Sequence, residues 1–378
     1  MVFLHYQYKN TINVISGKES KLKKQRSLFY FFSKTRISYL FTKFTSFLKL
    51  WISKNIVLLP PTTLMVEPTN LCNLKCPLCP TGLGTLNRDK RTMTYENFKY
   101  VIDQTHRYVR EIILWNYGEP FINKNILPMI SYATHKKIDI ITSTNGHFFH
   151  SLDYCKEIVK SGLHRVIVAI DGATQESYEK YRVGGDLQKV IQGVKWLVEA
   201  KKILKSKVPF IELQFILMKH NVHQKEEMKK LAEGLKVDLY VEKEVGIHPD
   251  ERRMFDLRHE FLPDHAKDHY FLNDKGEIQI QGEVPNFCDW PYRYAVVNAD
   301  GNLVPCCNDI DSHYVMGNLF KEDLLTIWRN EKYQKFRDAI RRNRKEVEIC
   351  RTCPHLVEFK DTPKNSQEKN IENPAGAV

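Results

Sequence analysis

Three cysteines, Cys72, Cys76 and Cys79, lie close together in the stretch LCNLKCPLCP (71–80) of a chain with nine cysteines among 378 residues. Three thiolates suit a four-iron cluster that keeps one iron without a protein ligand. Such an open position lets a metal site take up a substrate or cofactor, whereas a structural site fills its fourth position with protein. The alternative is a zinc site of three cysteines and one histidine, but the nearest downstream histidine is His106, beyond a predicted helix. The sequence therefore predicts an iron-sulfur cluster with one open iron.

The elements that must hold this loop alternate between apolar, β-branched runs and helical patterns. The runs predict strands, and the patterns between them, with apolar residues three or four positions apart, predict helices. Strands joined through helices favour a parallel sheet with right-handed crossovers, either doubly wound or a partial barrel. The predicted strands are 63–67, 111–115, 138–142, 165–170, 210–217 and 237–241, and the helices are 95–109, 124–135, 152–161, 187–202 and 225–234.

Polar or glycine-containing turns follow the next three predicted strands. They are Gly118-Glu119-Pro120, Thr144-Asn145-Gly146 and Asp171-Gly172. Each tripeptide alone would be an ordinary turn. Because the carboxyl ends of parallel strands meet at one edge, we expect these turns and the cysteine loop to converge on one ligand.

A second group of cysteines lies near the C-terminus. The segment YAVVNADGNLV (294–304) predicts a hairpin that turns at Asp300-Gly301 and brings two of these cysteines together. A helical stretch is predicted at 321–342. Four such cysteines could bind zinc or a fully ligated iron-sulfur cluster, and by themselves they favour zinc. They are Cys288, Cys306, Cys350 and Cys353, with Cys307 as the alternative to Cys306.

The formal net charge of +12 is concentrated in the first sixty residues, which hold eleven Lys or Arg and one acid, Glu19. The remainder is nearly neutral, so a nucleic-acid partner is not expected. No signal peptide and no long uncharged apolar run occur, which favours a cytoplasmic location. Apolar residues between Ile37 and Ile52 recur at helical spacing with basic residues off that face. This helix either lies at the inner face of a membrane or covers the following domain, and we favour the second interpretation.

Taken together, Cys72-x3-Cys76-x2-Cys79, Gly118-Glu119-Pro120 and Asn145-Gly146 resemble the radical S-adenosylmethionine (SAM) enzymes. The resemblance spans roughly 63–245 and implies a partial (β/α)6 TIM-like barrel. It implies a [4Fe-4S] cluster whose open iron chelates SAM, with Glu119 receiving the SAM ammonium group. It also implies SAM contacts from Leu78, through its backbone to the adenine, and from Gly118, Pro120, Thr144, Asn145 and Asp171.

The C-terminal cysteines are identified by resemblance as well. Cys288-x12-Gly301-x4-Cys306, then GNLF with Trp328, then Cys350-x2-Cys353 resemble the SPASM/Twitch extension. No cysteine follows Cys353, so the resemblance is to the shortened form, a small α+β domain with one auxiliary [4Fe-4S] cluster. The whole chain then divides into a basic helical leader (1–61), the radical SAM core (62–245), a linker (246–285), the auxiliary-cluster domain (286–356) and a disordered tail (357–378).

The resemblance implies a radical SAM oxidoreductase. Reductive cleavage of SAM would yield a 5'-deoxyadenosyl radical that abstracts hydrogen from a substrate C–H bond, and the auxiliary cluster would accept an electron. The substrate hydroxyl then needs a base, for which Asp309, Asp311 and His313 are candidates, although we favour a surface-loop role for them. Arg182 could grip the substrate or form an ion pair within the barrel.

The substrate is open at this stage. A sugar, cyclitol or glycan intermediate, oxidised or epimerised, is the first hypothesis, and a peptide or protein side chain is the alternative. A metal-stabilised binding module without catalysis is the third. The resemblance also implies a reducing partner such as flavodoxin or ferredoxin.

Overall fold

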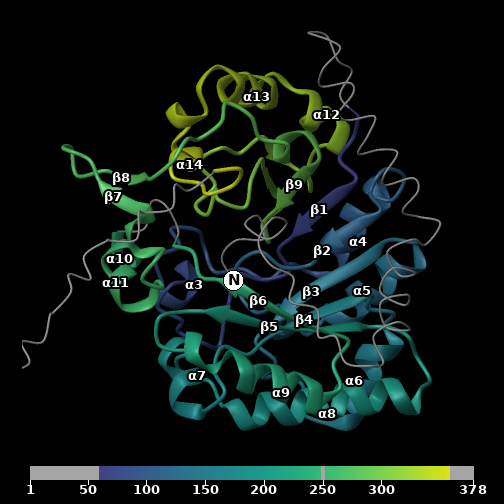
Figure 1. The fold of residues 1–378 in the computed structure, drawn as a ribbon. Helices are drawn as coiled ribbons and strands as arrows, with labels where there is room; N and C mark the ends of the chain where they lie inside the picture. The colour runs from purple at the N-terminus through teal and green to yellow at the C-terminus, as the bar shows by residue number, and fades with distance from the viewer. Residues whose placement is uncertain (1–58, 248–251, 358–378) are drawn as a thin grey trace, which may run out of the picture.

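Six parallel strands form the main sheet of the protein, which a computed structural model describes over residues 59–247 and 252–357. Consecutive strands pair in register, with Thr63 opposite Glu111 and Glu111 opposite Asp139. Each crossover carries a helix, as Figure 1 shows. The strands are β1 (Thr63–Val66), β2 (Glu111–Ile113), β3 (Asp139–Thr144), β4 (Arg165–Ala169), β5 (Phe210–Leu217) and β6 (Leu239–Glu244).

Helices α6 to α9 cover the outer face of the sheet at the bottom of Figure 1. Several crossover helices begin at a residue whose side chain accepts a hydrogen bond from a free backbone N–H, including Thr94, Ser151 and Asp186. Their apolar faces pack on the strands in one core. The helices of this region are α3 (Pro80–Leu83), α4 (Tyr95–Thr105), η1 (Pro120–Ile122), α5 (Ile126–His135), α6 (Leu152–Lys160), α7 (Gln175–Tyr181), α8 (Leu187–Ile203), η2 (Val222–Gln224) and α9 (Lys225–Leu235).

The C-terminal region continues the same sheet. Strand β9 (Tyr294–Val297) pairs in parallel with β1, and β10 (Asn302–Val304) and β11 (Gly317–Asn318) follow it antiparallel. The sheet order is therefore β11-β10-β9-β1-β2-β3-β4-β5-β6. Helices α12 (Leu324–Arg329), α13 (Glu331–Asn343) and α14 (Glu348–Arg351) lie at the other end of the molecule from α6 to α9 (Figure 1), and η4 (Trp290–Tyr292) and η5 (Arg344–Glu346) complete the region.

The fold agrees with the predicted α/β partial barrel, and the hairpin at 294–304 is present. The helical stretch predicted at 321–342 is present as two helices, because Asn330 ends α12 and caps α13 by accepting the Tyr333 N–H. The sixth strand begins two residues later than predicted, at Leu239. Its predecessor Asp238 accepts hydrogen bonds from Ile211 N and Lys201 Nζ instead of extending the strand.

The linker has more regular structure than the sequence suggested. It holds α10 (Arg252–Asp256), α11 (Arg258–Phe261), η3 (Lys267–His269) and a hairpin of β7 (Tyr270–Leu272) and β8 (Ile278–Ile280). Met254, Phe255 and Phe261 belong to a second core cluster that also contains Leu74 and Leu78 of the cysteine loop. The linker therefore supports the loop that carries the first three cysteines.

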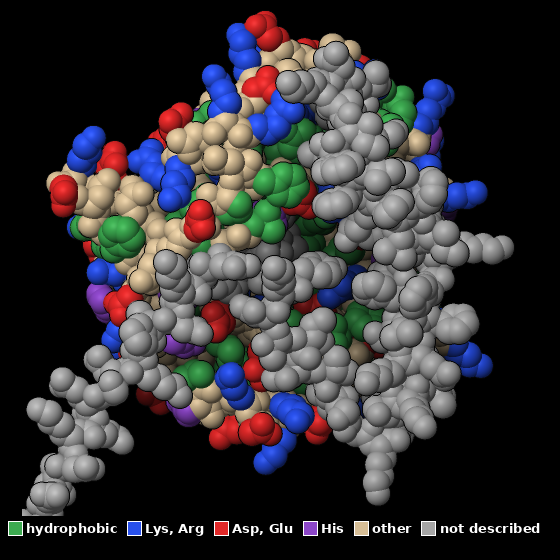
Figure 2. Space-filling model, turned by 45° about the horizontal axis from the view of Figure 1, so that its top comes forward, with side chains coloured by type: hydrophobic (Ala, Val, Ile, Leu, Met, Phe, Trp, Pro, Cys, Tyr) green, Lys and Arg blue, Asp and Glu red, His purple; other side chains and the backbone are tan. Residues whose placement is uncertain are grey.

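The predicted leader helix and the predicted tail lie outside the described residues, apart from the last few leader residues and Val357. Within 59–247 and 252–357 no helix is both long and apolar enough to cross a bilayer. On the face seen in Figure 2, basic and acidic side chains are interspersed along the rim of the described surface. The five segment boundaries stay predictions.

Candidate active site and metal centres

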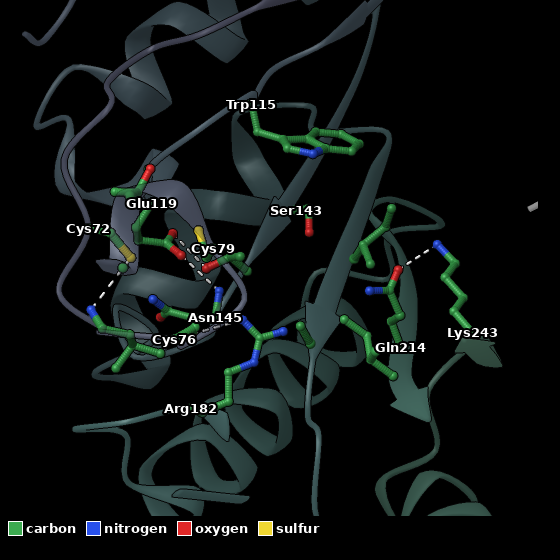
Figure 3. Close-up of a pocket in the computed structure, with 18 of the residues that line it drawn as sticks. Cys72, Cys76, Cys79, Trp115, Glu119, Ser143, Asn145, Arg182, Gln214 and Lys243 are labelled. Atoms are coloured by element: carbon green, nitrogen blue, oxygen red, sulfur yellow. Dashed lines mark hydrogen bonds between the residues drawn. The ribbon is translucent and has the colours of Figure 1, made fainter. Parts of the chain in front are cut away.

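The three N-terminal cysteines border one cavity. Cys72, Cys76 and Cys79 line it together, and none is in a disulfide (Figure 3). The turn that follows them folds back closely, since a Cβ on Gly82 would lie 2.4 Å from the Cys76 carbonyl oxygen. Burial raises the pKa of the Cys72 thiol to about 12 and also raises that of Cys76. Buried thiols without a cation stay protonated, so thiolates here need a metal, as a cluster site requires.

Glu119 forms a second wall of this cavity. Its carboxylate accepts hydrogen bonds from Thr144 Oγ1 at 2.7 Å, Asn145 N at 2.8 Å and Phe121 N at 3.1 Å. Burial raises its pKa to about 7 despite these three donors. Gly118, just before it, has a φ of 90°, and a Cβ there would lie 2.5 Å from the Thr69 carbonyl oxygen. The turn is therefore fixed by its glycine, and it presents a carboxylate that can receive a cationic ligand group.

Arg182 and Asp171 form a buried ion pair beside the cysteines. The Arg182 guanidinium binds the Asp171 carboxylate at 2.5 Å, and its Nη1 lies 3.9 Å from the Cys76 sulfur. Asp171 also accepts the Ile216 N–H at 2.8 Å. This places Arg182 in the cavity wall, with its charge already balanced by Asp171. The ion-pair alternative for Arg182 is therefore better supported than substrate binding.

Side chains of four consecutive strands, β3 to β6, together with Trp115 just after β2, line the far end of the cavity, which is partly open to solvent. In Figure 3, Gln214 and Lys243 lie opposite the cysteines. Lys243 Nζ donates to Gln214 Oε1 and lies 3.9 Å from Glu212 Oε1. Burial, together with the nearby Arg165, lowers the pKa of Lys243 to about 7. The residues at this end are Trp115, Ser143, Ile167, Gln214, Ile216, Lys243 and Glu244.

The structure brings most of the predicted site residues together. Cys72, Cys76, Cys79, Gly118, Glu119, Thr144, Asn145 and Arg182 all line the cavity. Three others do not, since Leu78 packs in the second core cluster, Pro120 begins η1 and the Asp171 side chain lies behind Arg182. Gln214 and Lys243 were missed. Their signal was the alternation of polar residues in the apolar run FIELQFIL, where Glu212 and Gln214 share the inner face.

The C-terminal cysteines form a separate, buried group. Burial raises the pKa of Cys288, Cys350 and Cys353, and each of these thiols also interacts electrostatically with Cys306. Cys306 therefore fits the fourth ligand position better than Cys307, which stays the alternative. Arg344 lies near these thiols. Four thiols gathered beside a buried cation are a donor set that fits a fully ligated iron-sulfur cluster.

Asp309 lies beside this group and not in the cavity. It is 1% exposed, and its two carboxylate oxygens accept hydrogen bonds from His313 N at 2.7 Å and Tyr314 N at 2.8 Å. Asp311 accepts two hydrogen bonds from Asn87. These contacts indicate that Asp309 and Asp311 hold their loop in place. The catalytic role that the sequence suggested for Asp309 stays a prediction.

A polar network joins the two cysteine sites. Arg88, in the loop after α3, forms two hydrogen bonds to the Glu67 carboxylate, at 2.8 and 2.9 Å, and donates to the Ile310 carbonyl at 2.6 Å. Tyr117, next to Gly118, donates to the Cys307 carbonyl at 2.9 Å. The loop of the first site is thus held against the loop of the second.

Comparison with known families identifies both regions. The model of the radical SAM superfamily matches residues 66–233, and the model of the iron-sulfur cluster-binding domain SPASM matches residues 288–354. The chain is a radical SAM protein with a SPASM domain. Its cofactors are a [4Fe-4S] cluster that binds SAM, SAM itself, and iron-sulfur in the SPASM domain. The two groups of thiols described above fit these clusters.

The relatives differ in what they act on. The probable GTP 3',8-cyclase of Methanocaldococcus jannaschii is 29% identical over 161 residues, 42% of this chain and 51% of the relative, so the chain spans about half of that protein. The mycofactocin maturase MftC of Mycobacterium tuberculosis is 22% identical over 314 residues, covering 78% of this chain and 76% of the relative. Streptococcus suis SuiB, solved with its precursor peptide SuiA, has a TM-score of 0.54 at 16% identity and covers 89% of this chain and 75% of its own. The last likeness shows the fold.

Proposed function

We propose that this radical SAM protein is an oxidoreductase that acts on a side chain of a peptide or protein. The observation that carries the chemistry is the single cavity that joins three thiols, the Glu119 carboxylate and a polar far end. The substrate class is supported by the maturase, whose similarity extends over about three quarters of both chains. A sugar, cyclitol or glycan substrate, our first expectation, has less support from the relatives, because none of those described above is named for one.

When bound, the cluster and SAM supply a 5'-deoxyadenosyl radical that abstracts hydrogen from a C–H bond. The residues of this chain position and protect that chemistry. The Glu119 carboxylate, held by three donors, would receive the SAM ammonium group, whose positive charge would favour the ionised carboxylate. Asn145 orders the adjacent loop, since its Nδ2 donates to Asn73 Oδ1 at 2.8 Å. Arg182 and Asp171 close the wall beside Cys76.

Oxidation of the substrate also requires loss of a proton, and Lys243 is the proposed acceptor. Its Nζ lies in the cavity wall beside Gln214, and its pKa of about 7 leaves a substantial fraction neutral at neutral pH. A base is most effective when its pKa is near the working pH. Glu212 is less suitable because Arg165 already forms an ion pair with it. Lys243 therefore takes the place that Asp309 held among our sequence-based candidates.

The test begins with reconstituted, reduced protein and SAM under anaerobic conditions. We expect 5'-deoxyadenosine to form, and Cys76→Ala to abolish it. Two substrate panels are then compared, one of short peptides that differ in a single hydroxyl, thiol or carboxyl side chain and one of sugars and aminocyclitols. The proposal expects a peptide to stimulate 5'-deoxyadenosine formation and to lose two hydrogen atoms by mass spectrometry. Stimulation by the sugar panel alone would restore the first hypothesis.

A further inference from the structure

Arg344 is a buried cation at the auxiliary cysteine site. It is the first residue of η5 and is 1% exposed. Its Nη1 donates to the main-chain oxygens of His355 at 2.8 Å and Phe287 at 3.3 Å, residues that lie next to or near cysteines in the sequence. Its backbone N–H donates to Asn286 Oδ1 at 3.0 Å. These bonds fix the guanidinium between the segment before Cys288 and the segment after Cys353.

The charged neighbours of the Arg344 guanidinium are the C-terminal cysteines. Cys353, Cys288 and Cys350 all lie close enough to Arg344 to interact with it electrostatically. Cys306 interacts with it as well, so all four C-terminal thiols are neighbours of this cation. Among the residues that the structure describes, no carboxylate is recorded in an ion pair with Arg344. Asp289, which follows Cys288 in the sequence, contacts His355 at 3.1 Å and Arg293 at 3.1 Å.

A second buried arginine in the same domain shows that this arrangement is specific. Arg337 on α13 is also 1% exposed. Its guanidinium lies over the rings of Tyr333, at 4.0 Å, and Trp328, at 4.5 Å, and donates to the carbonyl oxygens of Pro291 and Trp328. Its charge is therefore placed against aromatic faces and carbonyl groups. Of the two buried arginines, only Arg344 interacts with the thiols.

We infer that Arg344 is the built-in counter-charge of the auxiliary cluster and sets its reduction potential high enough for it to accept an electron. A thiolate-bound cluster becomes more negative by one charge when it takes up an electron, and a fixed neighbouring cation stabilises that state most. The low polarity of a buried site strengthens the effect. Arg344 is a positioning residue here, because it acts through the cluster and not on the substrate. This role rests on the proposed oxidation. In that reaction, Arg344 favours transfer of an electron from the substrate radical to the auxiliary cluster over return of a hydrogen atom to the substrate.

The test measures the potential of the auxiliary cluster in the full chain by EPR-monitored redox titration. The auxiliary signal is the one that persists when Cys72, Cys76 and Cys79 are replaced by alanine. Arg344→Met should lower the midpoint potential by at least about 59 mV, a tenfold change in the one-electron equilibrium constant. Arg344→Lys, which keeps the charge, should shift it by less than half of that. Arg337→Met is the matched control and should leave it unchanged.

The outcomes separate charge from folding and from the proposed function. An unchanged potential in an Arg344→Met protein with full iron content would overturn the inference. If Arg344→Met and Arg344→Gln lose auxiliary iron while Arg344→Lys keeps it, the requirement for a cation stands. Loss of that iron from all three variants would contradict it, since lysine retains the charge. SAM cleavage and substrate enter none of these measurements, so failure of the proposed function would show only in the 5'-deoxyadenosine assay.

Discussion

The two cysteine groups use the same side chain in opposite settings. Cys72, Cys76 and Cys79 border a cavity shared with Glu119 and the far strand ends. The four C-terminal cysteines lie near a buried arginine, Arg344, and three of them are buried themselves. Three thiols at a cavity leave room for a ligand at the metal, whereas four thiols in a packed interior do not. The difference indicates that the first site does chemistry on bound molecules and the second handles electrons.

The largest effect should come from breaking one site while sparing the other. We expect about eight irons per chain in the reconstituted protein. Cys76→Ala should abolish 5'-deoxyadenosine formation and keep about four irons, whereas Cys353→Ala should lose about four irons and keep SAM cleavage. Iron analysis and chromatography of 5'-deoxyadenosine measure both. Equal loss of cleavage in the two variants would remove the distinction between an open and a closed site.

The second prediction identifies the fourth cysteine ligand of the closed site. Cys306→Ser should lose the auxiliary cluster, because Cys306 interacts with Cys288, Cys350 and Cys353. Cys307→Ser should retain it, since serine keeps the main-chain carbonyl that Tyr117 binds and the three other thiols interact with Cys306. Iron content and the EPR signal of the reduced protein distinguish these results. The reverse pattern would assign Cys307 as the ligand.

The open site should depend on pH through Glu119, in a way that the closed site should not. The pKa of Glu119 is about 7 without ligand, so the carboxyl is mostly neutral below that pH and ionised above it. SAM affinity should therefore rise as pH increases from 6 to 8. Glu119→Gln should weaken binding roughly 10- to 100-fold, the value of a hydrogen bond to a charged group, and flatten the pH profile. Equilibrium binding of SAM to the reconstituted protein provides the measurement, and an unaltered profile in the variant would exclude Glu119 as its source.

The smallest effect concerns Lys243, a buried amine at the far end of the open site. Lys243 has its pKa lowered to about 7 by burial, below its unfolded value of about 10.4. Protonation of Lys243 therefore destabilises the native state relative to the unfolded state. This loss of stability is complete below pH 7 and disappears as pH rises toward 10. Lys243→Met should raise the free energy of unfolding by about 1 kcal/mol at pH 6, with a smaller gain at pH 9. Urea denaturation of the metal-free protein at both values checks this, and a loss of stability at pH 6 would contradict it.

The parts of the site that could be predicted from the sequence are those that short motifs encode. The cysteine loop, Gly118-Glu119-Pro120 and Thr144-Asn145 are short motifs whose role depends on the end of one strand, and the structure places most of these residues at one cavity. Arg344 and the Arg88–Glu67 pair gave no local signal, because Arg344 binds the main chain at Phe287 and Arg88 binds Glu67, both in segments far from the arginine in the sequence. Asp309 was attractive by its position near cysteines, yet its oxygens bind backbone N–H groups of its own loop. Side-chain partners of this kind follow from tertiary contacts, which periodicity does not report.

The pairing of β1 with β9 has a consequence for how the protein is made. Strand β1 is the first strand of the described chain, but one of its two edges binds Tyr294–Val297. During synthesis that edge stays open until the segment Tyr294–Val297 has been made, because domains fold as their segments emerge from the ribosome. An open strand edge can pair with other chains. Nascent chains stalled before residue 294 should therefore be the species that aggregates or recruits chaperones.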